Sequence, residues 1–281
     1  MKFLSYKYKG QTSFGWTEDE ENVYDLKKIH NEAYSSLKDY IASKEWGETL
    51  DKTEAIPMED IQLLPVIPNP DKIICAGVNY DEHRLETKRE TLAHPIIFLR
   101  VAESQVAHEA DVILPKNSMK LDYEGEMAIV IGKEGRHISK EDSWEYIAGY
   151  SVYNDVSVRD WQLHTSQWGP GKNFDGTGAF GPYLIPRSAI QDGENLKLQT
   201  RLNGEVVQSS ETDLLLFTIP ELIEYISGFT TLRPGDVIAT GTPGGVGLKR
   251  NPPLFMKAGD VVEVEVEKIG LLRNPIVAES E

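Results

Sequence analysis

Short apolar runs with the composition of β-strands recur along this chain, and they restrict its fold more than any other feature. They are KIICAGV at 72–78, PIIFLRV at 95–101, MAIVIG at 127–132 and VVEVEVE at 261–267, which alternates with a period of two. Such short runs are typical of strands. The clearest helical pattern is Ile219 to Ile226, with Pro220 in its first turn. We therefore expect a mainly β fold with some α-helix, not a doubly wound parallel sheet.

Three prolines in the segment LLPVIPNPDK, at 63–72, divide the chain. Proline opposes helix formation and favours extended backbone, so this segment is typical of a connector. We predict a small α/β N-terminal domain over 1–68, with strand-like residues at its start and a helical segment around Asn31 to Lys44. A mainly β domain over 69–281 is expected to follow.

The net charge is strongly negative, because 45 acidic residues face 29 Lys and Arg residues, giving a formal charge of -16. This charge repels phosphate backbones and anionic membrane surfaces, so we expect neither nucleic acid nor a membrane as a partner. It also repels an anionic substrate. A site that binds an acid therefore needs its own positive charge, from a metal or from Arg and Lys.

The remaining composition indicates an intracellular globular protein. The single cysteine, Cys75, lies in an apolar run and is expected to be a small buried hydrophobic residue. The N-terminus turns polar too early for a signal peptide, and no apolar run approaches the ~18 residues that cross a bilayer. We expect a cytoplasmic location.

Three acidic residues form a candidate metal site. Glu124 and Glu126 lie two apart just before an apolar run, so on a strand both side chains point to one face. Asp155 lies in a second β-like stretch, YSVYNDVSVRDWQ, although an Asp after an Asn is also typical of a turn. Three carboxylates would make a hard-oxygen site for Mg²⁺ or Mn²⁺, with Ca²⁺ also compatible, rather than for zinc.

A histidine and a glutamate form a candidate acid-base pair. His83 and Glu86 are three residues apart, which makes them neighbours on one helical turn. A Glu beside a His orients the imidazole and raises its basicity, as general-base activation of water requires. The alternative is an exposed charged helix, because the segment HRLETKRE at 83–90 is rich in charge.

Two glycine-rich stretches follow. In SQWGPGKNFDGTGAFGPYL, at 166–184, we expect no regular element; Lys172 in its centre is either a positive charge that reaches an anionic substrate or a solvated loop lysine. The stretch TLRPGDVIATGTPGGVG, at 231–247, contains Thr242. It lacks the Gly-Lys-Ser/Thr ending of a phosphate-binding P-loop, which excludes nucleotide binding of that kind.

Taken in order, these motifs resemble the fumarylacetoacetate hydrolase (FAH) superfamily over Asp71 to Ala278. The matching segments are NYDEHRLE at 79–86, DYEGE at 122–126, NDVSVRDWQ at 154–162, WGPGKNFD at 168–175, FGP at 180–182, NGEVVQ at 203–208 and PGDVIATGTPGGVG at 234–247. The N-terminal domain resembles that of the two-domain bacterial members. Arg100 stands where a lysine is common, and we expect it not to touch the metal ligands.

The resemblance implies the mixed β-sandwich roll of the FAH fold and a homodimer. It also implies a role for each matching residue: metal ligands at Glu124, Glu126 and Asp155; catalytic groups at His83, Glu86 and Lys172; and substrate-binding groups at Arg159, Thr242, Tyr80 and Gln162. The His83 and Glu86 dyad would lie on a lid over a small-molecule 2-keto acid.

From these residues we expect a divalent-metal-dependent hydrolase that cleaves a carbon-carbon bond in a 2,4-diketo acid, such as an acylpyruvate or a fumarylpyruvate-like compound. His83, oriented by Glu86, would activate a water, and the metal and Lys172 would stabilise the pyruvate enolate. Two alternatives use the same site: decarboxylation of oxaloacetate, and keto-enol isomerisation, including that of a 2-hydroxy-diene-dioate. A non-catalytic metal-binding protein is the third, and the complete set of ligand and dyad residues disfavours it.

Overall fold

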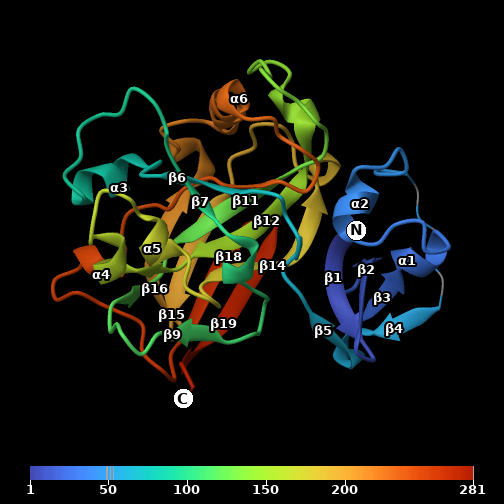
Figure 1. Cartoon of the computed structure of the whole chain (residues 1–281), viewed down its shortest axis with the longest axis horizontal. Coiled ribbons are helices and arrows are strands. Elements are labelled where there is room, and N and C mark those ends of the chain that lie inside the picture. The colour runs from blue at the N-terminus through green and yellow to red at the C-terminus, as the bar shows by residue number, and fades with distance from the viewer. Residues whose placement is uncertain (49, 51, 53, 281) are drawn as a thin grey trace.

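The computed structural model describes residues 1–48, 50, 52 and 54–280, and it is mainly β with few helices (Figure 1). Two open, mixed sheets contain most of its strands. The fold class expected from the short apolar runs is therefore confirmed. Among the described residues, no helix combines the length and apolar character that crossing a membrane requires.

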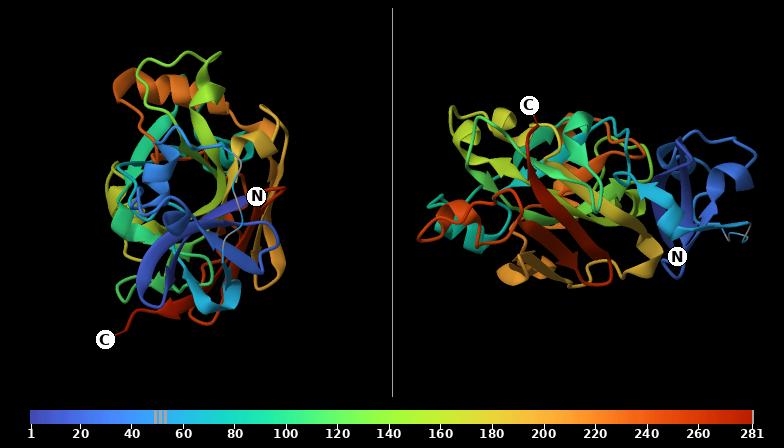
Figure 2. Two further views of the ribbon diagram at one scale, coloured as in Figure 1. Left: turned by 90° about the vertical axis from the view of Figure 1, so that its right-hand side faces the viewer. Right: turned by 90° about the horizontal axis from the view of Figure 1, so that it is seen from below.

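The N-terminal unit lies at one end of the molecule (Figures 1 and 2). Its strands are β1 (Lys2–Tyr8), β2 (Gln11–Thr17), β3 (Asn22–Asp25), β4 (Ala55–Pro57) and β5 (Ile61–Leu63), and its helices are α1 (Leu26–Ile29) and α2 (Leu37–Ile41). The side chain of Ser36 caps α2 by accepting a hydrogen bond from the Asp39 N–H. The helix expected around Asn31 to Lys44 is therefore shorter than predicted, because this cap starts it at Leu37.

The N-terminal strands continue into the central sheet, because β1 pairs with β14 at Phe3 and Leu184. From β14 the sheet runs through β12, β11, β17 and β6 to β7, and β8 pairs with β14 at its side. The bounds are β6 (Ile73–Gly77), β7 (Ile96–Arg100), β8 (Gln105–Val106), β11 (Gly125–Ile131), β12 (Ile147–Asp155), β14 (Gly178–Pro186) and β17 (Val237–Ala239). The division at 68 and 69 stays a prediction; it falls between β5 and β6.

A second sheet packs against the central one, as the side views indicate (Figure 2). It contains β9 (Val112–Leu114), β15 (Lys197–Leu202), β16 (Glu205–Glu211), β18 (Val261–Val266) and β19 (Gly270–Ala278), while β10 (Leu121–Asp122) and β13 (Ser157–Val158) form a separate pair. Met127 and Ile129 of β11 share an apolar cluster with Val264 of β18. Ala128 and Val130 belong to a cluster on the opposite face. Strand β11 is thus buried on both faces, which explains its continuous apolar run.

Four helices belong to the larger unit: α3 (Asp81–Glu86), α4 (Arg159–Gln162), α5 (Gly169–Lys172) and α6 (Ile219–Phe229). Helix α6 confirms the helical pattern and continues three residues beyond Ile226. It begins at a capping box in which Thr218 and Glu221 satisfy each other's backbone N–H groups.

The expectation of no regular element in 166–184 was wrong, because α5 and β14 occupy much of this segment. The glycines of this segment allow neighbouring atoms to approach the backbone more closely than a side chain would permit. A Cβ on Gly171 would lie 2.3 Å from the backbone nitrogen of Gln162, and one on Gly178 would lie 2.7 Å from the hydroxyl of Tyr153. Cys75 is fully buried among apolar residues, as expected.

Candidate active site

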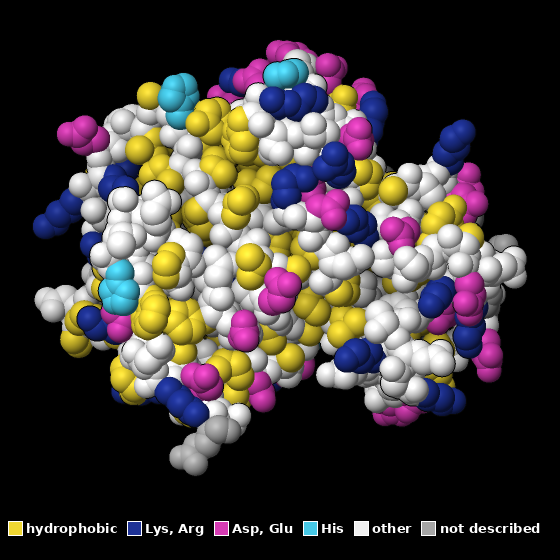
Figure 3. Space-filling view, viewed as in Figure 1, with side chains coloured by type: hydrophobic (Ala, Val, Ile, Leu, Met, Phe, Trp, Pro, Cys, Tyr) yellow, Lys and Arg dark blue, Asp and Glu magenta, His cyan; other side chains and the backbone are white. Residues whose placement is uncertain are grey.

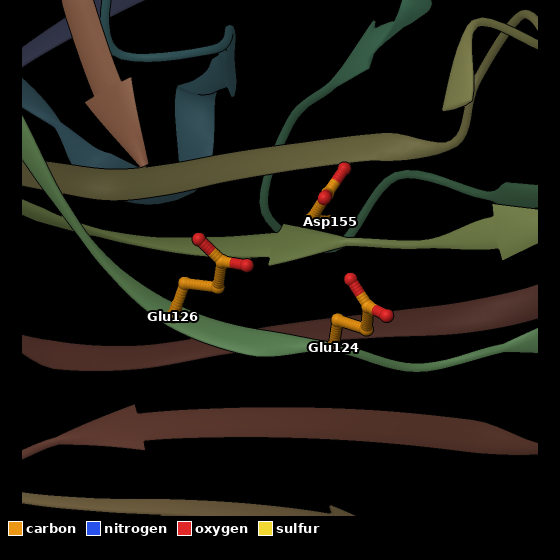
Figure 4. Close-up of side chains that lie close together, drawn as sticks. All are labelled: Glu124, Glu126 and Asp155. Carbon is orange, nitrogen blue, oxygen red and sulfur yellow. The ribbon is translucent and has the colours of Figure 1, made fainter. Parts of the chain in front are cut away.

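The three predicted metal ligands come together at adjacent ends of two core strands. Glu124 immediately precedes β11, Glu126 lies within it, and Asp155 is the last residue of β12. Figure 4 shows the three carboxylates pointing toward one another. One ligand oxygen of each lies within 4.8 Å of the others, and all three residues are buried. Asp155 therefore lies in a strand, as its β-like segment predicted, and is not a turn residue.

Buried cations surround two of these carboxylates. Arg159 lies 2.6 Å from one oxygen of Glu124, and Lys172 Nζ lies 2.6 Å from the other. Lys172 Nζ also lies 2.6 Å from Asp155, so it bridges two of the three ligands. Lys172 is 1% exposed, which excludes the solvated loop lysine.

Arg100 provides the third buried cation, which corrects our expectation that it does not touch the metal ligands. Its Nη1 lies 2.6 Å from Asp155 Oδ1, and its guanidinium also donates to Thr177 Oγ1 at 2.8 Å. The error arose because local sequence gives no hint of a contact between residues 55 positions apart. With Arg100, three cations balance three carboxylates.

The pKa values follow from this pairing. Burial alone would raise the pKa of Glu124, but the charges of Arg159 and Lys172 outweigh it and hold the pKa below its ordinary value. Burial raises the pKa of Glu126 well above its ordinary value, and the neighbouring Asp155 and Glu124 raise it further. Burial lowers the pKa of Lys172, but Asp155 and Glu124 more than offset this, so it stays an ammonium ion.

Glu126 is the ligand without a cation of its own. Its Oε2 accepts a hydrogen bond from the Gly241 N–H at 2.8 Å. A buried carboxylate in this position is stabilised by a divalent cation, and carboxylate oxygens are ligands that Mg²⁺, Mn²⁺ and Ca²⁺ prefer. The oxygens of Glu124 and Asp155 already accept hydrogen bonds, yet each keeps a second lone pair for an ion. The donor set therefore fits a divalent metal.

The predicted dyad forms on α3. His83 Nδ1 lies 2.6 Å from Glu86 Oε1, and His83 is only 6% exposed. The exposed-helix alternative applies to Leu85, which is 58% exposed, but not to His83. Because Nδ1 faces Glu86, Nε2 is the ring nitrogen available to a substrate.

Backbone N–H groups of the loop after β17 orient both halves of the site. Gly241 donates to Glu126, as above, and Gly245 donates to Glu86 Oε2 at 3.0 Å. Gly245 has a φ of +98°, and a Cβ there would lie 2.4 Å from the Val207 carbonyl oxygen. The glycine-rich turn thus has a structural requirement at this position, because only glycine fits the conformation and the space.

The same loop binds a carboxylate to which sequence analysis assigned no role. Asp122 accepts hydrogen bonds from the N–H groups of Gly247 and Leu248, each at 2.8 Å, and lies 2.7 Å from Arg159 Nε. Its membership of the DYEGE motif was the available signal. Arg159 is thereby fixed between Asp122 and Glu124.

The three carboxylates and His83 of the dyad open into one cavity of about 200 Å³, whereas Glu86 is not among its described lining residues. Of the residues expected in the site, its lining includes the metal ligands, His83, Lys172, Arg159, Gln162 and Thr242. Tyr80 is absent from the described lining; it is the N-cap residue of α3, and burial raises the pKa of its phenol. The lining residues that sequence analysis missed include Arg89, Phe98, Trp168 and Lys249, which come from separate segments.

Thr242 and Arg159, both expected to bind substrate, differ in whether they keep a free hydrogen-bond donor. Thr242 donates its hydroxyl hydrogen to the Gly125 carbonyl at 3.0 Å, so contact with a carboxylate requires this hydroxyl to turn. Arg159 keeps Nη2 without a hydrogen-bond partner among the described residues, although the residue is 3% exposed. Arg159 is therefore the better anchor for an anion.

The fold and this site match a known family. The family model described as "Fumarylacetoacetate (FAA) hydrolase C-terminal" matches residues 72–277. The chain belongs to the fumarylacetoacetate hydrolase family. The resemblance drawn from the ordered motifs is therefore confirmed, and members of this family are enzymes with a divalent metal as a typical requirement.

Relatives in the family carry the name of one activity. A mitochondrial oxaloacetate tautomerase of Rattus norvegicus is 45% identical over 223 residues, which cover 79% of this chain and 71% of the relative. An oxaloacetate tautomerase of Bacillus subtilis (strain 168) is 36% identical over an alignment of 301 residues, which covers 98% of this chain and all of the relative.

Solved structures carry other names. A fumarylacetoacetate hydrolase from Exiguobacterium antarcticum superposes with a TM-score of 0.87 at 34% identity, covering 99% of this chain and 100% of the other. A 2-hydroxyhepta-2,4-diene-1,7-dioate isomerase from Mycobacterium marinum superposes with a TM-score of 0.81 at 30% identity, covering both chains completely. The family thus contains a hydrolase, an isomerase and tautomerases by name.

Proposed function

We propose that this chain is a divalent-metal-dependent keto-enol tautomerase of oxaloacetate or a closely similar 2-keto acid. The observation that carries the proposal is the shared cavity, which the three carboxylates, His83 and Lys172 all line. Tautomerisation requires these elements: an electrophilic centre for the keto acid and one group that moves a proton. The names of the rat and Bacillus relatives support the choice of substrate.

The size of the cavity also favours a small substrate. Pockets for drug-sized ligands commonly enclose roughly 300–1,000 Å³, whereas this cavity encloses about 200 Å³. A four-carbon acid suits such a space.

Each polar group has a distinct task in this proposal. A divalent ion on Glu124, Glu126 and Asp155 would polarise the keto acid. Arg159 binds the substrate carboxylate through Nη2, and Gln162, which accepts from Arg159 Nη1 at 2.9 Å, keeps that guanidinium in place. These contacts supply the local positive charge that an anionic substrate needs in a chain of net negative charge.

His83 transfers the proton, and Lys172 stabilises the charge that develops. His83 Nε2 takes a proton from carbon 3, because Nδ1 is held by Glu86. The Lys172 ammonium stabilises the negative charge that develops on the 2-oxygen. The protonated His83 then delivers this proton to that oxygen, so the keto form becomes the enol without gain or loss of atoms and the imidazole is neutral again.

Hydrolysis of a 2,4-diketo acid is the second candidate. The short contact between His83 and Glu86 suits proton abstraction from carbon, and it would also suit activation of a water. The similarity to the Exiguobacterium hydrolase supports hydrolysis as well. Decarboxylation of oxaloacetate and isomerisation of a 2-hydroxy-diene-dioate use the same groups. A homodimer and a cytoplasmic location stay predictions.

Three assays on one preparation separate these activities. Chelator-stripped protein receives Mg²⁺ or Mn²⁺, and we follow decay of the oxaloacetate enol absorbance, release of pyruvate from oxaloacetate, and loss of acetylpyruvate. We expect metal-dependent equilibration of the enol with neither pyruvate release nor acetylpyruvate loss. Cleavage of acetylpyruvate alone would replace the proposal with hydrolysis, and pyruvate release would replace it with decarboxylation. Silence in all three assays would refute oxaloacetate tautomerisation, oxaloacetate decarboxylation and acetylpyruvate hydrolysis.

A further inference from the structure

We propose that Arg89 and Lys249 form a second anion-binding end of the cavity, which selects substrates with a carboxylate distant from the 2-keto acid group. This inference rests on the proposed function and adds the groups that distinguish a dicarboxylic from a monocarboxylic substrate. Both residues line the cavity that contains the carboxylate cluster.

Arg89 is positioned by an aromatic support. Its guanidinium carbon lies 5.1 Å from the centroid of the Trp168 ring, a contact typical of a cation-π interaction. The Trp168 ring lies so close to Gly77 that a Cβ there would approach it to 2.3 Å, and it meets Phe98 edge-on at 5.5 Å. The packed indole therefore gives the arginine a defined place although Arg89 is exposed.

Lys249 is positioned by the loop that holds Asp122. It ends the short 3-10 turn Gly247–Lys249, and two N–H groups of this turn bond to the buried Asp122. Because Asp122 also fixes Arg159, the backbone that presents Lys249 is connected to the inner end of the cavity.

The charges in the lining determine what these two cations can bind. Lys172 and Arg159 are both paired with metal-ligand carboxylates. Within the described part of the chain, neither Arg89 nor Lys249 has an ion-pair partner. The acidic residues of the lining are the three carboxylates of the metal site. Two uncommitted cations in a chain with a formal charge of -16 oppose the field that would repel a dianion.

Several cations elsewhere in the chain lie against carboxylates, unlike Arg89 and Lys249. Figure 3 shows one face of the molecule, on which Lys and Arg side chains are interspersed with Asp and Glu side chains. Lys38, for example, lies 2.6 Å from Asp71, and Lys140 lies 3.0 Å from Glu221. Among the residues that the structure describes, Arg89 and Lys249 differ from other cations without an ion-pair partner, such as Lys88, because they line the cavity.

Binding of two matched, stable acids tests the inference. L-malate and 2-hydroxybutanoate share a four-carbon 2-hydroxy acid skeleton, and only malate has the second carboxylate. We measure both by calorimetry on the Mg²⁺-loaded full chain, its Arg89→Gln and Lys249→Gln variants, and a Lys88→Gln control. Lys88 is exposed and adjacent to Arg89 but does not line the cavity.

The expected result is a selective loss. Loss of one charge-assisted hydrogen bond corresponds to roughly a tenfold loss of affinity, so Arg89→Gln should weaken malate by about this factor and leave 2-hydroxybutanoate unchanged. Lys249→Gln should act in the same direction, and Lys88→Gln should change neither ligand. Equal weakening of both ligands in Arg89→Gln, or an equal loss of malate in Lys88→Gln, would overturn the inference.

Turnover separates this inference from the proposed function. We compare kcat/KM for oxaloacetate and for its 4-methyl ester, which keeps the 2-keto acid and loses the distal charge. Selective weakening of malate together with no tautomerisation would support the second carboxylate site and reject the activity. Tautomerisation with equal kcat/KM for the diacid and the ester in the wild type would support the activity and reject the site.

Discussion

The carboxylate cluster and His83 line the same cavity but belong to different kinds of structure. Glu126 and Asp155 lie on β11 and β12, whose residues are buried throughout. The dyad lies on α3, a six-residue helix that is followed by an exposed segment. The core thus builds the metal site, whereas the dyad depends on a few specific contacts.

Hydrogen bonds at both ends of α3 connect it to the rest of the molecule. Gly245 donates to Glu86, and Asn79, just before the helix, donates to the carbonyls of Phe217 and Thr240. Asn79 is 1% exposed. Loss of a carboxylate that pairs with a buried cation should therefore affect folding and metal binding, while loss of the dyad should affect proton transfer alone.

Asp155→Ala gives the largest expected effect. It removes the partner of Arg100 and a partner of Lys172, and leaving buried cations unpaired costs about 3–5 kcal/mol. We expect metal binding and turnover to be lost and the free energy of unfolding to fall by this amount in urea denaturation. The exposed Asp175→Ala is the control and should leave the unfolding curve unchanged. A variant that kept its stability would argue against the cation network.

His83→Ala should separate chemistry from binding. Removal of a general acid-base group typically lowers turnover by about 10²–10⁴-fold. We expect kcat to fall within this range while the Mn²⁺ affinity and the unfolding curve stay unchanged. His94→Ala, an exposed histidine near the same segment, serves as the control. Loss of metal binding in His83→Ala would contradict the division between the two regions.

Arg100→Lys tests the contact that sequence analysis missed. A lysine retains the charge beside Asp155 but loses the planar guanidinium that also reaches Thr177 and the Val156 carbonyl. Substitution of a residue that orients a metal ligand commonly costs about 10–100-fold in metal affinity. We expect the lower end of this range in a Mn²⁺ titration, with little change in stability. An unchanged affinity would make Arg100 a structural residue only.

The sequence predicted the parts of this site that depend on local spacing. A two-residue spacing placed Glu124 and Glu126 on one face, and a three-residue spacing placed His83 beside Glu86. Continuous apolar runs predicted the core strands, and the helical spacing of apolar residues after Pro220 predicted α6. The ordered motifs then connected segments that local patterns alone would have left separate.

The features that were missed depend on contacts between distant segments. Arg100 meets Asp155 because β7 and β12 end near each other in the folded sheet. The glycines around Lys172 allow close packing, which composition alone does not distinguish from flexibility. Arg89 joins the cavity through Trp168, 79 positions further along the chain. None of these pairings has a periodic signal in the sequence.

The most direct test of the account is a calorimetric Mn²⁺ titration of chelator-stripped wild type and Glu126→Gln. Glutamine resembles the neutral carboxyl that a raised pKa favours in the metal-free protein, and it can still accept from Gly241, so the fold should persist. We predict one ion per chain for the wild type and none for Glu126→Gln, with unchanged or higher stability of the metal-free variant. Equal Mn²⁺ binding by both proteins would contradict the metal site on which the proposed function depends.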